Sequence, residues 1–282
     1  MTPASTPCPP LRGAGGHHAP RQGPGAAPLA ISRTSPGILL LALLLLLWEL
    51  ASRLGAVRPD LLPPVSVVVG EIGRLTVSGE LLRQILATTE RVLGGFVAGG
   101  LFGVLLGFGC GVFPGLGRAS RVTVEFLRPM PSVALIPIGI LFLGLGFGLC
   151  VAVAGFACAW PAYVAALAGA SAAGPELRDT ARVYGLTRRE TILRVLAPAA
   201  LPQVLSGLRV ALAVAVAVAV TTEMAASPDG LGSFILEASL SRHPERMYAG
   251  IVVIGVLGFA LNTAFVALRR RVLRWMPEGE LR

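Results

Sequence analysis

Runs of apolar residues long enough to cross a lipid bilayer constrain this chain more than any other feature. A spanning helix needs about 20 consecutive, predominantly apolar residues. Hydrophobic residues make up 54% of the 282 residues and charged residues only 14%, a composition outside the range of ordinary soluble domains. In lipid every backbone polar group must be bonded inside the protein, so each run is expected to be helical. The runs lie at 37–55, 94–113, 131–170, 204–224 and 248–268.

Two of these runs need interpretation before the spans can be counted. Residues 131–170 exceed the length of one crossing, and the segment GLGFG at 144–148 is typical of a turn, so we predict two helices and a short hairpin there. The alternating VALAVAVAVAV within 204–224 favours a strand when taken alone. A single strand among helices would leave its backbone unpaired in lipid, so helix is the better prediction. The sequence therefore predicts an all-α integral membrane protein with about six transmembrane helices.

The composition outside the spans predicts how the chain is divided. Residues 1–36 are rich in Pro, Gly and Ala, and we expect them to form a disordered cytoplasmic tail. Residues 37–277 form the expected transmembrane domain, and 278–282 a short cytoplasmic C-terminal end. The first run is similar to the core of a signal peptide, but the long tail before it and the spans after it favour an uncleaved helix.

The distribution of Arg predicts the orientation in the membrane. All basic residues of the chain are Arg, since the sequence contains no Lys. If the N-terminus is cytoplasmic, the segments on that side hold more than twice as many Arg residues as the segments on the other side. Positively charged residues concentrate in cytoplasmic segments of membrane proteins. We therefore predict a multi-pass protein with both termini in the cytoplasm.

Several classes of function lack the residues that they require. The net charge is +9, but the Arg residues are scattered between apolar runs, so no nucleic-acid partner is expected. The four Cys residues form no CxxC pair, and His17 and His18 have no other ligand type at a helical spacing, so no metal is expected. No GxSxG or HExxH motif occurs, and a Walker A motif is impossible without Lys. We therefore expect no catalytic residue and no cofactor in this chain.

A regular glycine pattern marks the second run. On a helix, a glycine at every fourth position forms a stripe of small residues that allows another backbone to approach closely. We predict that the stripe is a helix-packing surface, either within this chain or in contact with a second subunit. Its members are Gly95, Gly99, Gly103, Gly107 and Gly111.

The stretch DTARVYGLTRRETILRVLAPAALP, residues 179–202, is polar where its surroundings are apolar. Residues 176–184 favour a helix, Gly185 can take the left-handed conformation that ends it, and Thr187 can cap a second helix. Pro198 is expected to stop that second helix and redirect the chain into the membrane. The prediction is a rigid helix-turn-helix between spans 4 and 5 that is suited to docking on a partner.

This stretch resembles the coupling motif of bacterial ABC importer permeases, in which Glu-Ala-Ala, three residues, Gly, nine residues and Ile-x-Leu-Pro follow one another. Asp179 stands where the family has Glu, Thr180 where it has Ala, and Ala197 where it has Leu. The matching positions are Asp179, Thr180, Ala181, Gly185, Val195, Ala197 and Pro198.

Segments on both sides of this motif narrow the resemblance to the nitrate/sulfonate/taurine group of these permeases. The resemblance covers about residues 37–277, almost everything but the tail. The segments are TTERVLGGFVAG (88–99), RPMPSVALIPIGILFLGLG (128–146), LPQVLSGLRVAL (201–212), TTEM (221–224), GLGSFILEA (230–238) and RRVLRWMP (270–277).

The resemblance implies a transport subunit and not an enzyme. It implies an importer built from two copies of this chain, a cytoplasmic ABC ATPase dimer that binds ATP and Mg, and a periplasmic or lipid-anchored solute-binding protein. The coupling stretch would contact the ATPase, and the external segments 56–93 and 225–247 would receive the binding protein. The cargo implied is a small anion such as a sulfonate, nitrate or taurine, and the location is the bacterial inner membrane.

The translocation pathway is less well marked in the sequence. Arg209 and Glu223 lie near the ends of the fifth span, and ionisable groups in membrane segments usually face a cavity or a partner. Anchoring at the membrane interface is an equal alternative for both residues. The alternative function is a secondary transporter that works without an ATPase. The six runs show no clear internal repeat and few charges near their centres, which disfavours that alternative.

Overall fold

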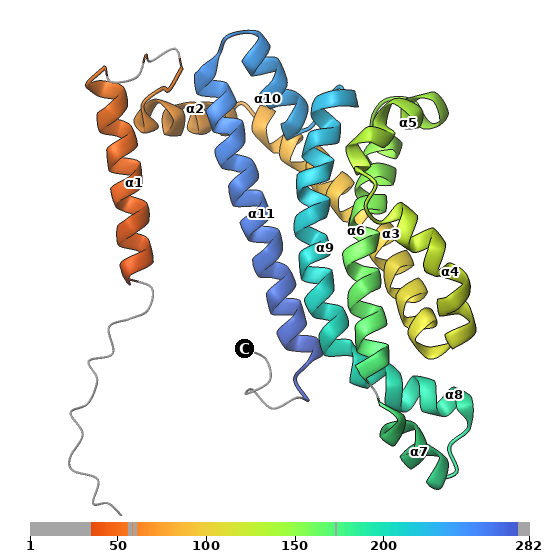
Figure 1. Cartoon of the computed structure of the whole chain (residues 1–282). Coiled ribbons are helices and arrows are strands. Elements are labelled where there is room, and N and C mark those ends of the chain that lie inside the picture. The colour runs from red at the N-terminus through yellow and green to blue at the C-terminus, as the bar shows by residue number, and fades with distance from the viewer. Residues whose placement is uncertain (1–34, 56–57, 59–60, 173, 276–282) are drawn as a thin grey trace, which may run out of the picture. The chain divides into compact units, whose positions relative to one another are not determined.

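The computed structural model describes residues 35–55, 58, 61–172 and 174–275. Within these residues the chain is entirely helical and contains no strand (Figure 1). The tail predicted at 1–36 lies outside the described residues except for Ser35 and Pro36, and the end predicted at 278–282 lies wholly outside them. The chain divides into two units, Met1–Leu45 and Leu46–Arg282, and helix α1 begins in the first unit and ends in the second.

The helices follow one another with short connections. Their bounds are α1 (Ser35–Arg53), α2 (Val65–Val77), α3 (Glu80–Val112), α4 (Pro114–Leu127), a 3-10 helix (Ser132–Leu135), α5 (Ile136–Leu143), α6 (Phe147–Ala172), α7 (Pro175–Val183), α8 (Arg188–Glu190), a π-helix (Thr191–Leu196), α9 (Ala197–Ala226), α10 (Leu231–Leu240) and α11 (Pro244–Val272).

Four helical segments in the described part of the chain are long and apolar enough to cross a membrane. They are Glu80–Val112, Phe147–Ala172, Arg188–Ala226 and Pro244–Val272. A fifth span is available if α4 and the segment Ser132–Leu143, which meet at an angle of 86°, cross together as one bent element. The first apolar run of the sequence forms α1, which is not among these candidates. That α1 crosses the membrane as a further span stays a prediction.

The structure differs from the sequence prediction in two places. Residues 131–170 do form two helices separated by a turn, but α5 has only 8 residues and cannot cross a membrane alone. Pro198 does not end a helix, because the π-helix and α9 continue through it. Pro198 is the second residue of α9, and proline is tolerated there because the preceding π-helical turn leaves room for its ring.

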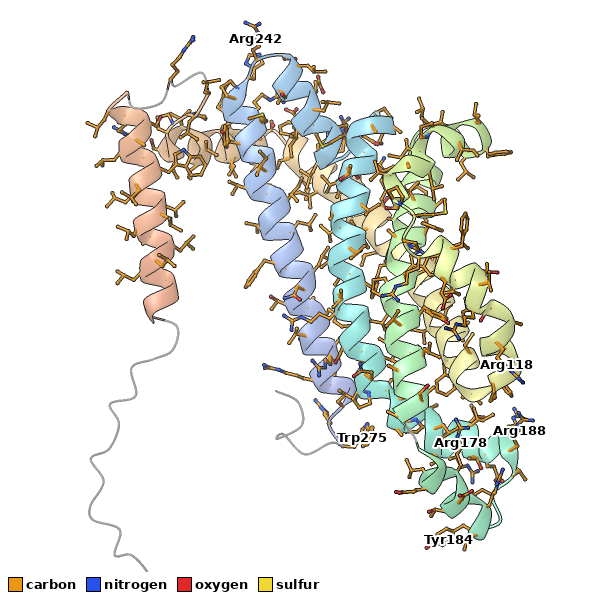
Figure 2. The ribbon with its side chains drawn as sticks, in the orientation of Figure 1. Arg118, Arg178, Tyr184, Arg188, Arg242 and Trp275 are labelled. Atoms are coloured by element: carbon orange, nitrogen blue, oxygen red, sulfur yellow. The ribbon has the colours of Figure 1, made fainter. Side chains whose placement is uncertain are left out.

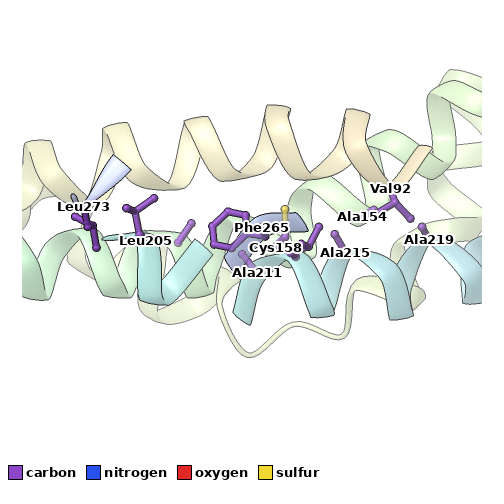
Figure 3. Packing of buried hydrophobic residues seen from close by; sticks show 11 residues of the cluster. Val92, Ala154, Cys158, Leu205, Ala211, Ala215, Ala219, Phe265 and Leu273 are labelled. Carbon is purple, nitrogen blue, oxygen red and sulfur yellow. The ribbon is translucent and has the colours of Figure 1, made fainter. Parts of the chain in front are cut away.

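The core of the unit Leu46–Arg282 is a bundle in which α6 lies between α3 and α9. Side chains from α3, α6, α9 and α11 meet in the largest buried cluster (Figure 3). Small residues dominate it, among them Ala154, Ala211 and Ala215, while Phe265 fills the wider space. Because lipid tails are as apolar as leucine, close packing and not the hydrophobic effect drives such helices together.

The glycine stripe of α3 lies against α6 of the same chain. A Cβ atom at Gly99 would be 2.0 Å from the carbonyl oxygen of Gly155, and one at Gly103 would be 2.2 Å from that of Ala159. A Cβ atom at Gly107 would likewise be 2.2 Å from the carbonyl oxygen of Tyr163. The backbones of the two helices are thus in contact along the stripe. Gly95 and Gly111 continue the contact at its ends, where a Cβ would lie 2.8 Å and 2.6 Å from the Cβ atoms of Ala154 and Ala170.

A second cluster joins α2, α10 and α11 at one end of the bundle. Its fully buried members are Val68, Leu75, Leu231 and Ala249, and Phe234 packs beside them. α2 and α10 lie within the expected external segments 56–93 and 225–247, for which no fold was predicted. They form two short helices packed on the end of α11, so this end of the bundle is covered by folded structure.

Candidate functional site

The predicted helix-turn-helix is present as α7, a tight turn and α8. The turn has φ of +71° at Gly185, and two backbone bonds end α7: Gly185 N donates to Arg182 O at 2.9 Å, and Leu186 N donates to Ala181 O at 3.0 Å. This bond pair is the Schellman arrangement, which satisfies the last carbonyl groups of a helix. The prediction that Gly185 takes the left-handed conformation is confirmed.

The second helix is capped as the sequence predicts. Thr187 Oγ1 accepts a hydrogen bond from Glu190 N at 3.3 Å, and Thr187 N donates to Glu190 Oε2 at 3.0 Å, which together form a capping box. Glu190 and Arg194, four residues apart, form an ion pair at 3.4 Å. Since both helix ends facing the turn are satisfied internally, the turn is held rigidly.

The matched coupling positions divide between the surface and the interior. Asp179 and Thr180 are exposed, while Ala181 is buried with 3% of its surface accessible. Val195 and Pro198 are half-buried and lie farther along, in the π-helix and α9. The motif therefore brings Asp179, Thr180, Ala181 and Gly185 together around α7, and its last two positions lead into the membrane helix.

Large apolar side chains on the helix-turn-helix are exposed. Val183 is 86% exposed, Tyr184 79% and Leu193 58%. Figure 2 shows Tyr184 at the far tip of this element, away from the bundle. Ile192, in the π-helix that follows α8, instead packs inward against the end of α3. Exposed apolar side chains on a rigid, capped projection are typical of a surface that binds another protein.

The helix-turn-helix is fixed to the end of α3. Arg178 Nη2 donates to the carbonyl oxygen of Gly111 at 3.4 Å, and the Arg188 guanidinium lies 5.0 Å from the centre of the Phe113 ring. Ile192 and Leu196 pack beside Val112. Because α3 carries the glycine contact with α6, a displacement of α7 and α8 would be passed directly to the packed bundle.

Glu223, one of the two pathway candidates, lies in the interior of the chain. None of its surface is exposed. Its carboxylate accepts three hydrogen bonds: from Thr88 Oγ1 at 2.9 Å, from Gly232 N at 3.0 Å and from Arg91 Nη1 at 3.1 Å. A buried charge is tolerated when it is paired and fully bonded in this way.

The loop between α9 and α10 closes over this carboxylate. Arg91 also donates to the carbonyl oxygen of Asp229 at 2.8 Å and forms an ion pair with its carboxylate. The hydrogen bond from Arg91 holds the pKa of Asp229 below its ordinary value. Gly230 has φ of +108°, and a Cβ there would lie 2.4 Å from the carboxyl carbon of Glu223. Thr88, Arg91, Glu223 and Asp229 thus form a polar clamp that ties α3, α9 and the start of α10 together.

Arg209, the other pathway candidate, faces α11. Its Nε donates to Asn262 Oδ1 at 2.9 Å. It is not among the residues that line the grooves described next. The structure therefore brings neither Arg209 nor Glu223 to the grooves, and it separates the two residues along α9.

A groove of about 730 Å³, the central groove, lies along α6, α9 and the segment that follows α4. It was not predicted from the sequence. Trp160 and Pro161 of α6 and Gly207 and Val210 of α9 form its apolar walls. Arg128, which follows α4 at the 86° bend, is its charged residue. The polar members of the lining are Ser132, Gln203 and Ser206. In the sequence, Arg128 counts only as one of the Arg residues that predict orientation. The two prolines that follow it in RPMP (128–131) are a local sign of a bend.

A second groove of about 720 Å³ reaches the same arginine along α4. Arg121, Glu125 and Arg128 line it at a spacing that places them on one face of the helix. Arg121 and Glu125 pair at 2.8 Å with 74% and 64% of their side chains exposed. A charged residue at the centre of a bilayer costs about 2.5–3.5 kcal/mol on insertion scales. This face of α4 therefore suits water or a protein partner and not lipid.

The described residues contain no group of three or more His, Cys, Asp or Glu side chains that could hold a metal ion. The site thus consists of a docking element, a polar clamp and a central groove.

The model of the family "Binding-protein-dependent transport system inner membrane component" matches residues 99–276. The chain belongs to this family.

Curated relatives extend over most of this permease. The taurine transport system permease protein TauC of Escherichia coli (strain K12) is 29% identical over 245 residues, which are 84% of this chain and 88% of TauC. SsuC of Bacillus subtilis (strain 168), named for the transport of aliphatic sulfonates, is 28% identical over 248 residues, 86% of this chain and 88% of SsuC. The permease is thus similar to members of the sulfonate and taurine group.

The fold also occurs in solved transporters. A chain of the MetNI methionine ABC transporter in an inward-facing conformation superposes with a TM-score of 0.58 at 20% sequence identity. The match covers 68% of this permease and 97% of that chain. At this identity the likeness concerns the fold alone, so the two chains share an arrangement of helices.

Proposed function

We propose that this permease is the membrane subunit of an ATP-driven importer of small organic sulfonates, with nitrate as the related inorganic cargo. Two copies would form the translocation pathway across the bacterial inner membrane, and a cytoplasmic ATPase dimer would bind ATP and Mg. An external binding protein would deliver the solute. The relatives named for taurine and aliphatic sulfonates support this cargo class.

The observation that carries the proposal is the rigid, exposed element formed by α7 and α8. It is capped at both helix ends, anchored on α3 and continuous with the membrane helix α9. Only a stiff element in contact with an ATPase can transmit the closure of that ATPase to the spans. The exposed Val183 and Tyr184 would fill a surface groove of the ATPase.

The experiment is to purify the tagged permease from its native membrane in mild detergent and to identify the proteins that accompany it by mass spectrometry. We expect an ATP-binding subunit with the wild-type chain. Gly185→Arg should lose that subunit, or keep it while ATP hydrolysis no longer drives uptake, because a residue with a side chain is strained at a φ of +71°.

A matched variant separates backbone strain from a general loss of structure. Asn tolerates the left-handed conformation better than other residues with side chains, so Gly185→Asn should keep most of the copurified ATPase. Gly185→Val, of similar bulk but β-branched, should lose it. A wild-type permease that purifies alone, from membranes containing candidate ATPases, would favour the secondary transporter instead.

A further inference from the structure

The central groove has a single charged residue at mid-depth. Trp160 and Pro161 stand near the middle of α6 (Phe147–Ala172), and Val210 near the middle of α9 (Ala197–Ala226). Arg128 lines the groove beside them. The groove therefore places a guanidinium group about halfway between the two ends of the membrane helices.

The guanidinium of Arg128 has capacity to bind a ligand. Within the residues that the structure describes, its side chain has no hydrogen-bond or ion-pair partner. Arginine stays charged at all physiological pH values and presents five N–H donors. The central groove contains no Asp or Glu, and Glu125, which shares the second groove with Arg128, pairs with Arg121 at 2.8 Å. An unneutralised cation inside a membrane protein attracts an anion.

The surroundings of Arg128 supply further hydrogen-bonding groups. Ser132 and Gln203 line the groove, and neither side chain is bonded within the described part of the chain. Trp160 lines it too and is only 8% exposed, so its ring adds to the apolar wall. Ser132 and Gln203 therefore keep their polar groups available to a ligand in the groove.

We propose that the groove at Arg128 is the binding site in the pathway for the anionic group of the transported solute. A sulfonate has three acceptor oxygens, of which two can take parallel N–H bonds from one guanidinium. The remaining oxygen would accept from Ser132 or Gln203. The apolar walls of Pro161 and Val210 would contact the alkyl part of the solute. This assignment of cargo rests on the proposed function, whereas the presence of an anion site does not.

The first experiment tests the site without knowledge of the cargo. Ser132→Cys is introduced in a Cys8→Ala background, in which the three other cysteines are buried. Membrane vesicles with the intact complex are treated with an anionic sulfonate-bearing and a cationic ammonium-bearing methanethiosulfonate reagent. The positive field of Arg128 should favour the anionic reagent, so Arg128→Gln should lower the anionic-to-cationic rate ratio about tenfold.

Arg118→Gln is the matched control, because Arg118 lies in α4, which leads into Arg128, is exposed and lines neither groove. It removes the same charge and should leave the ratio unchanged. An unchanged ratio in Arg128→Gln would overturn the proposal. So would a Ser132→Cys thiol that reacts with neither reagent, because the groove would then be closed to aqueous anions.

The second experiment measures uptake of radiolabelled taurine by vesicles that contain the ATPase and the binding protein. Arg128→Gln should lower uptake about tenfold, and Arg128→Lys should retain more, since a single ammonium replaces a two-donor contact. The variant must still copurify with the ATPase. If the wild-type complex takes up none of taurine, methanesulfonate and nitrate, the proposed cargo is contradicted. The reactivity of the Ser132→Cys thiol would still report on the anion site. Unchanged uptake in Arg128→Gln would overturn the anion site itself.

Discussion

At the scale of single residues, the polar clamp explains why a carboxylate is buried in a membrane helix. Glu223 has donors from three sources: the hydroxyl of Thr88, the backbone of Gly232 and the guanidinium of Arg91. The cost of removing this charge from water is offset only while all three contacts are kept. Glu223 therefore acts as a fixed link between α3 and the loop before α10.

We predict that Glu223→Ala destabilises the permease strongly. The change leaves Arg91 with one carboxylate partner in place of two, and removing one member of a buried charge pair typically costs about 3–5 kcal/mol. The exposed Glu237 on α10 provides the control, and Glu237→Ala should fall within about 0.5 kcal/mol of the wild type. Thermal unfolding of both variants in the same detergent gives the comparison. Equal melting temperatures would show that the clamp does not hold the fold.

Local residue chemistry was predictable from the sequence, and the clamp was not. Gly185 and Thr187 act on backbone atoms a few residues away, so their types and spacing suffice to predict the turn and the cap. Arg91 and Glu223 are 132 residues apart. Read alone, Arg91 counts toward topology and Glu223 toward the pathway, because their pairing depends on how α3 and α9 pack.

At the scale of helices, the contact between α3 and α6 sets the geometry of the bundle. The glycine stripe brings the backbone of α3 against carbonyl oxygens of α6, which no side chain would allow. The four-residue spacing predicted a packing surface but could not identify the partner helix. That choice depends on Gly155, Ala159 and Ala162 of α6, which do follow a helical spacing. Because α6 carries Ala or Gly on all of its faces, this spacing does not stand out in the sequence.

We predict that Gly107→Ala destabilises this contact. Its Cβ would lie 2.2 Å from the carbonyl oxygen of Tyr163, so the two backbones must separate, and such overpacking costs about 1–3 kcal/mol. Gly255 lies within the spanning helix α11 with open space around it. Gly255→Ala should be neutral or slightly stabilising, since Ala favours helix over Gly by about 1 kcal/mol. The yield of monodisperse protein and its melting temperature in detergent would distinguish them. Equal losses would indicate a general intolerance of added methyl groups.

The bent span was missed because its two halves have different sequence patterns. α4 carries Arg118, Arg121 and Glu125 and has no continuous apolar run, while the segment Ser132–Leu143 is apolar but short. A search for long apolar runs finds the second half and discards the first. The charges of α4 lower its mean hydropathy, and for this reason a search for apolar runs does not find the helix. The same charged face requires contact with water or protein, and Arg128 at its end lines both grooves.

At the scale of the whole molecule, the docking proposal depends on which end of the bundle faces the cytoplasm. Helix α11 runs from Pro244 to Val272, about 43 Å at 1.5 Å per residue, which exceeds the hydrocarbon thickness of a bilayer. Leu273 packs in the same cluster as Leu205, close to the start of α9. The C-terminal end of α11 therefore lies at the end of the bundle where α8 joins the membrane helix.

We predict that this end is cytoplasmic, because Arg269, Arg270 and Arg271 close α11. In a Cys8→Ala background, Leu240→Cys, at a position 76% exposed, should react with an impermeant maleimide on intact cells. Trp275→Cys, at a position 58% exposed, should react only after permeabilisation. The reverse pattern would place α7 and α8 outside the cell, where no ATP-hydrolysing subunit could reach them. The docking proposal would then fail together with the topology, whereas the anion site at the middle of the bundle would remain open to test from either side.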